Sequence, residues 1–296
     1  MIFRHLLLPL AAMLAFPAFA QEDRGQADGD IVVTGERERE VAPRAITRQA
    51  REISRMGNFH NDPLARFEDR ACPGVIGLRQ DAAEMMVGMI RARAELLGIP
   101  LASENRCSPN IVVLFSADGR AELKEFQRKH HYLSDVLSVG ELRELMEDEG
   151  PVRVWSIVET RMANGMPVAR RRDLVNLPVG RMWAAHSKLT LSSRQDIVAT
   201  LVVFDRDAVV GKSLAQLADY AAMRSFARTR DMEGEAALDT ILGLFSGDGP
   251  KPPGLTPFDR AYLASLYDGV ANIPAAAKLL RVESKLQEGA AMQAAE

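Results

Sequence analysis

The chain has 296 residues, of which 37 are basic and 40 acidic, so its formal net charge is −3 at pH 7. This balance lacks the basic excess typical of nucleic-acid-binding proteins, and we therefore expect no nucleic-acid partner. An apolar fraction of 47% is ordinary for a globular protein, and the length allows one large domain or two smaller ones.

The first twenty residues have the three parts of a secretory signal. A short segment with Arg4 is followed by the apolar run 6–16 and then by Ala18-Phe19-Ala20, a small-x-small cleavage motif. The run is shorter than the ~20 residues that a helix needs to cross a bilayer. We predict a signal peptide over residues 1–20, cleavage after Ala20, export to the periplasm and no transmembrane segment in the mature chain. The alternative is an uncleaved helix at the membrane surface.

The mature part holds two cysteines, Cys72 and Cys107. An even number of cysteines in an exported chain favours a disulfide. The alternatives are two buried thiols or a redox pair, although the C-x-x-C spacing of redox pairs is absent. We predict a structural disulfide between Cys72 and Cys107.

We assign residues 21–61 to a polar, disordered arm that ends in a short helix over residues 45–56. Within the arm, Asp30-Ile-Val-Val-Thr-Gly-Glu36 resembles the short stretch around the TonB box of TonB-dependent receptors. The resemblance implies a strand that pairs with a protein partner through residues 30–36. The polar composition itself favours a solvated linker with a β-prone patch.

Residues 62–230 predict an α+β core domain, in which a mixed sheet of about five strands packs against helices. Strand patterns occur at residues 67–78, 110–115, 152–160, 183–191 and 196–204. Helical periodicity and capping signals occur at residues 80–97, 121–129, 138–147 and 213–228. Residues 231–296 predict a helical C-terminal part with helices at 235–245, 258–267 and 275–287.

Gly211-Lys212-Ser213 lies between a predicted strand and a predicted helix, as in a phosphate-binding loop. Such a loop needs another glycine five residues before Gly211, and Arg206 stands there. We therefore expect neither a nucleotide nor another cofactor.

The histidines show no spacing typical of a catalytic or metal centre. Outside the signal they are His60, His130, His131 and His186. Neither His-Glu-x-x-His nor Gly-x-Ser-x-Gly occurs, so we expect no metal site, and His186 stands only as a candidate base. We assign the main basic patch, residues 170–172, to an exposed loop; contact with phosphates or lipid headgroups is the alternative.

The order of the predicted elements resembles the N-terminal half of zincin metallopeptidases. In zincins, the helix after the edge strand carries His-Glu-x-x-His, and here the corresponding helix includes residues 217–224. The resemblance places Ala218 and Ala222 at the metal histidines and Asp219 at the general base. Because alanine cannot ligate zinc, it implies a scaffold that has lost its metal. Residues 255–269 also resemble a segment of exported proteobacterial families of unknown function with zincin-like folds.

These patterns together predict a periplasmic binding or scaffolding protein without catalytic activity. The alternative is a periplasmic, metallopeptidase-like hydrolase with a non-standard site that uses Asp219 or His186.

Overall fold

The computed structural model describes residues 42–104, 106–130, 137, 139–168, 187, 189–232, 236–247 and 249–294. Residues 41–296 form one compact unit. The expected signal peptide with its cleavage point after Ala20, and the expected pairing segment 30–36, lie outside the described residues.

The described part of the chain contains one mixed sheet of four strands, in the order β1-β2-β4-β3. They are β1 (Pro73–Ile76), β2 (Ile111–Ser116), β3 (Val152–Met162) and β4 (Ser193–Asp205). β1, β2 and β4 run parallel, and β3 pairs antiparallel with β4. The α+β class is confirmed. Five strands are not found, because most of the expected strand 183–191 lies outside the described residues, and residues 187 and 189–191 are not in a strand.

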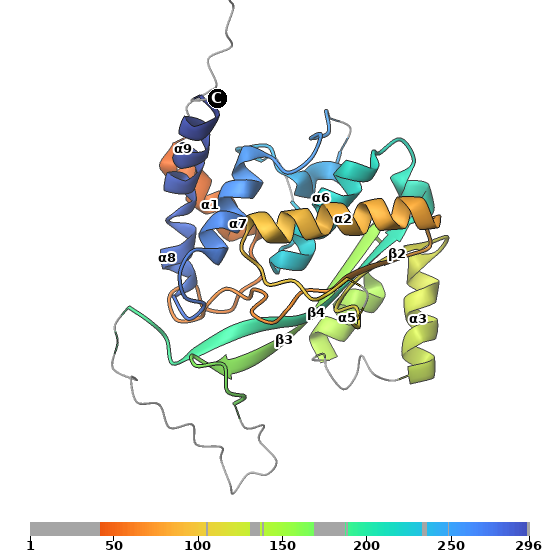
Figure 1. Cartoon of the computed structure of the whole chain (residues 1–296), viewed down its shortest axis with the longest axis horizontal. Coiled ribbons are helices and arrows are strands. Elements are labelled where there is room, and N and C mark those ends of the chain that lie inside the picture. Colours follow the sequence, from red (N-terminus) through yellow and green to blue (C-terminus); the bar gives the residue numbers. More distant parts are fainter. Residues whose placement is uncertain are drawn as a thin grey trace, which may run out of the picture. The chain divides into compact units, whose positions relative to one another are not determined.

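Both faces of the sheet are covered by helices, as Figure 1 shows. Along β4, Val202 and Phe204 contribute to the main core, whereas Val203 contributes to a smaller core on the other face, as the alternation of a strand requires. The main core is covered by α2 (Gln80–Leu96) and α6 (Leu214–Phe226). The smaller core is covered by α3 (Gly119–His130) and α5 (Val139–Glu147).

The two helices on the main core form for different local reasons. In α2 the fully buried residues Met86, Ile90 and Ala94 recur every four positions, which is the spacing of one helix face. α6 begins with a capping box between Ser213 and Gln216, and every residue from 217 to 226 is buried. The predictions of both helices are confirmed.

The C-terminal helices pack with the first helix of the described chain and share the main core with the sheet (Figure 1). They are α7 (Pro257–Tyr267), α8 (Ala275–Leu279) and α9 (Val282–Gln293), beside α1 (Pro43–Ile53). The predicted helix 258–267 is confirmed. The single helix expected at 275–287 is two helices, with Leu280 and Arg281 between them. No helix in these described ranges is long and apolar enough to cross a membrane.

The helix predicted at 235–245 is wrong over its described residues. Only a short 3-10 helix, η2 (Ile241–Phe245), forms there. Asp259 of α7 accepts hydrogen bonds from the Thr240 hydroxyl at 2.6 Å and from the Ile241 amide at 2.7 Å. Thr240 is held in an extended conformation, with φ −144° and ψ 144°, so a helix cannot run through it.

Candidate functional site

Asp219, the acidic candidate on α6, is occupied by structural contacts. Its side chain is 5% exposed and faces Arg93 of α2, whose Nε and Nη2 donate to its two carboxylate oxygens at 2.7 and 3.3 Å. The Leu255 amide donates to Oδ2 at 2.8 Å. A Cβ atom at Gly254 would lie 2.5 Å from the same oxygen, so the chain approaches this closely because residue 254 is glycine. Asp219 therefore joins α2, α6 and the segment before α7.

The neighbours of Asp219 offer no metal ligands. Ala218 and Ala222 are buried at 1% and 0% exposure in the main core. Their methyl groups cannot bind zinc, so the residues at these positions do not fit the ion that a zincin carries. Within the described ranges, three or more His, Cys, Asp or Glu side chains nowhere gather in a way that could hold a metal ion.

Several other predicted candidates lie where the structure gives no account of them. His186, His131 and the basic patch 170–172 fall outside the described residues, and nothing is described of the His130 side chain at the end of α3. Of the four predicted histidines only His60 is described in full, and it is not among the hydrogen-bond partners of Asp219.

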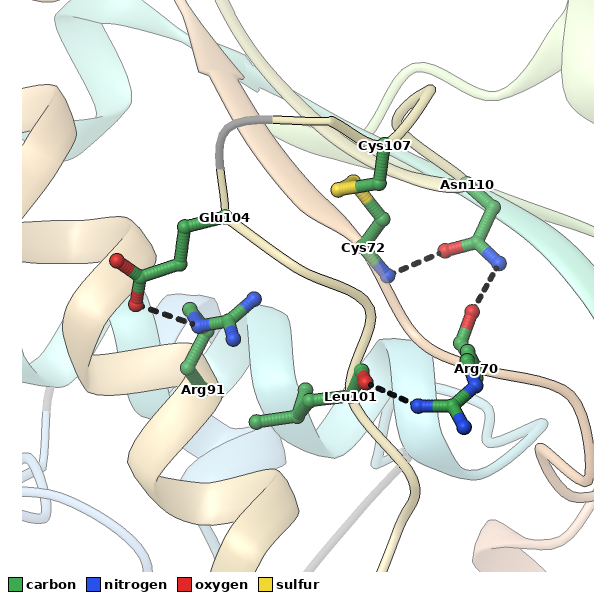
Figure 2. Close-up of a disulfide and its surroundings, with 7 residues drawn as sticks. All are labelled: Arg70, Cys72, Arg91, Leu101, Glu104, Cys107 and Asn110. Atoms are coloured by element: carbon green, nitrogen blue, oxygen red, sulfur yellow. Dashed lines mark hydrogen bonds and ion pairs between the residues drawn. A yellow bond between two sulfur atoms is a disulfide. The ribbon is translucent and has the colours of Figure 1, made fainter.

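The predicted disulfide between Cys72 and Cys107 is confirmed, with Cα atoms 6.2 Å apart (Figure 2). It joins the start of β1 to the segment before β2. Asn110 reinforces this junction, because its side chain accepts from the Cys72 amide at 2.7 Å and donates to the Arg70 carbonyl at 3.0 Å. An ion pair between Arg91 and Glu104 ties the intervening loop to α2 at 3.0 Å. The disulfide thus fixes the edge of the parallel part of the sheet.

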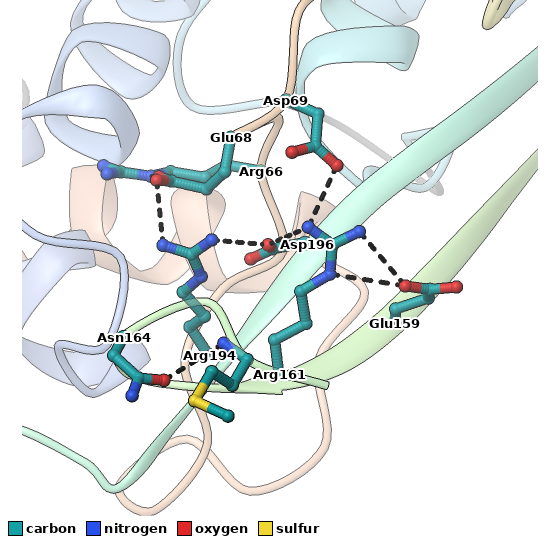
Figure 3. Close-up of polar contacts among 9 residues, drawn as sticks. Arg66, Glu68, Asp69, Glu159, Arg161, Asn164, Arg194 and Asp196 are labelled. Atoms are coloured by element: carbon teal, nitrogen blue, oxygen red, sulfur yellow. Dashed lines mark hydrogen bonds and ion pairs between the residues drawn. The ribbon is translucent and has the colours of Figure 1, made fainter. Parts of the chain in front are cut away.

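A network of ion pairs lies at the far end of the β3–β4 ribbon (Figure 3). Its centre is the fully buried Asp196. The Oδ2 atom of Asp196 accepts a hydrogen bond from Arg194 Nη2 at 2.8 Å and lies 3.3 Å from Arg161 Nη1. Burial raises the pKa of Asp196 above its ordinary value, although both arginines oppose this shift. The two guanidinium groups therefore favour the charged form of this buried carboxylate.

The same arginines reach outward to carboxylates of the segment before β1. Arg194 pairs with Glu68 at 3.2 Å, and Arg161 pairs with Asp69 at 2.9 Å. Glu68 also accepts from Arg66 at 2.6 Å. Every arginine of this network contacts a carboxylate, so we assign the network to fixing the ribbon against residues 66–69.

A polar cleft lies where the start of β3 meets α5, the end of α6 and residues 228–231. It encloses about 60 Å³. Two of its walls are joined by surface ion pairs, Arg228 with Glu141 and Arg55 with Glu144. A third pair lies deeper: Arg224 Nη1 donates to Asp231 Oδ1 at 2.7 Å.

Arg224 is the most deeply buried charged group of this cleft, with a side chain that is 4% exposed. Its guanidinium lies 5.8 Å from the ring of Tyr220, whose hydroxyl also donates to Asp231, at 2.9 Å. Arg224 Nε and the Thr229 hydroxyl are buried and have no hydrogen-bond partner among the described residues. Buried polar groups of this kind are rare in proteins and call for an explanation.

A larger surface groove of about 580 Å³ lies beside α1 and also includes Asp231. Its charged members include Arg51, which lies 4.6 Å from the ring centre of Phe59, and the exposed Arg230. The groove is open and contains no buried charged group, so the cleft at Arg224 is the better-formed site.

Comparison with protein-family models, with curated proteins and with solved structures finds no match.

The sequence patterns did not single out the cleft, because its residues come from segments that are far apart in the chain. Arg55 follows α1, Glu141 and Glu144 lie on α5, and Arg224 ends α6. The only local sign was Arg224 itself, a basic residue among the apolar and small residues of a helix that is otherwise core.

Proposed function

We propose that the chain is an exported binding protein without catalytic activity, built on a zincin-like arrangement that lacks metal ligands. The order of the elements supports the arrangement. β3 lies antiparallel at the end of the sheet order, β4 follows it inside the sheet, and α6 comes after β4. In the proposed arrangement, α6 takes the position of the metal-binding helix of a zincin.

The observation that carries the proposal is the hydrogen bonding of the Asp219 carboxylate. A general base needs an oxygen that reaches a water or a substrate proton. Both oxygens of Asp219 instead accept hydrogen bonds from Arg93, and Oδ2 also accepts from Leu255. With alanine at positions 218 and 222, the helix supplies packing at the positions where zincins carry their metal ligands.

Two further features support export and binding. Disulfides persist mainly in oxidising compartments, so the bond between Cys72 and Cys107 favours the periplasm as the location. The polar cleft at Arg224 is the better-formed of the two cavities described and suits a binding site. A protein partner that pairs with residues 30–36 remains part of this proposal.

A hydrolysis assay tests the absence of catalysis. The mature protein and its Asp219→Asn variant are incubated with unstructured peptides and with activated esters. We expect both proteins to give the background rate of the buffer. A rate that is well above background in the parent protein and that is lost in the folded variant would establish the hydrolase instead.

The partner is tested by deleting residues 30–36. The parent protein and the deletion variant are each immobilised, and the periplasmic proteins that they retain are compared. Any complex found in this way is then reconstituted from purified components, and its affinity is measured. The proposal expects a partner whose purified form binds the parent at least tenfold more tightly than the deletion variant. Equal binding would remove residues 30–36 from the proposal.

A further inference from the structure

We draw no further inference here: the strongest candidate, the surface groove of about 580 Å³ between α1 and residues 230–232, borders residues 233–235, which lie outside the described ranges, and nothing in the structure shows what covers its exposed arginines.

Discussion

Arg93 of α2 and Asp219 of α6 meet in two hydrogen bonds, from Nε to Oδ1 at 2.7 Å and from Nη2 to Oδ2 at 3.3 Å. The two residues lie 126 positions apart, and their pairing connects the two helices that cover the main core. The contact holds these two helices together, at a position that the proposed zincin-like arrangement assigns to the general base.

Asp219→Asn should lower the free energy of unfolding by about 2–3 kcal/mol. The asparagine amide brings donors where Arg93 and Leu255 already donate, so at least one buried contact is lost. Urea denaturation followed by circular dichroism measures the change. Asp81→Asn, in the exposed pair with Arg79, serves as the control and should leave the midpoint unchanged. Equal midpoints for Asp219→Asn and the parent would contradict the structural role.

Replacing Cys72 and Cys107 together with alanine should lower the free energy of unfolding by about 3–4 kcal/mol. The bond closes a loop between residues 35 positions apart, and most of its effect comes from restricting the unfolded chain. Thermal unfolding with and without a reductant gives the same comparison in the parent protein. A parent whose unfolding temperature is insensitive to a reductant that breaks the bond would contradict this estimate.

Lys278 of α8 gives a predicted pH dependence of stability. Burial lowers its pKa to about 8, and the nearby Arg66 acts in the same direction. Between about pH 8 and its ordinary pKa of 10.5, the unfolded chain binds more protons at this site than the folded chain. Because of this difference, stability from Lys278 should rise with pH across that window.

Lys278→Met should therefore stabilise the protein at pH 7 by about 1–2 kcal/mol, because it removes a buried charge whose ammonium group donates to the Asp268 carbonyl. It should also remove the rise between pH 8 and 10.5. Denaturation at a series of pH values measures both effects, with Lys124→Met on the surface of α3 as the control. A parent and a Lys278→Met variant with parallel stability profiles would show that Lys278 is not the titrating group.

The proposed export predicts where the mature protein is found and which residue it begins with. When the full gene is expressed in a bacterial host with a periplasm, the protein should appear in the periplasmic fraction with Gln21 as its first residue, because Ala18-Phe19-Ala20 forms the cleavage motif. Intact-mass measurement and N-terminal sequencing check this. A protein that retains Met1, in the cytoplasm or the membrane, would contradict export.

Local sequence patterns predicted much of the fold where packing and propensity agree. The strands at 110–115 and 196–204 and the helix at 80–97 have apolar side chains in the period of their element, and all three are present. The failure at 235–245 has a tertiary cause. Asp259, which is about twenty residues away, holds Thr240 in an extended conformation, and no local pattern contains that contact.

The candidate site was less predictable for the same reason. The resemblance of residues 217–224 to the His-Glu-x-x-His helix of zincins singled out Asp219. Its partner Arg93 lies on another helix and cannot be inferred from spacing. The cleft at Arg224 exists only because four separate segments of the described chain meet there, and no local pattern contains that meeting. The disulfide was predictable, because two cysteines permit only one intramolecular pairing.

The metal content of the mature protein, purified from the periplasm without chelators and without a histidine tag, tests the central claim most directly. Elemental analysis by mass spectrometry should find zinc and other transition metals far below one equivalent per chain, because Ala218, Asp219 and Ala222 cannot form a zinc site. Zinc near one equivalent, retained through gel filtration, would contradict the account and would make a metal-dependent hydrolase the leading explanation.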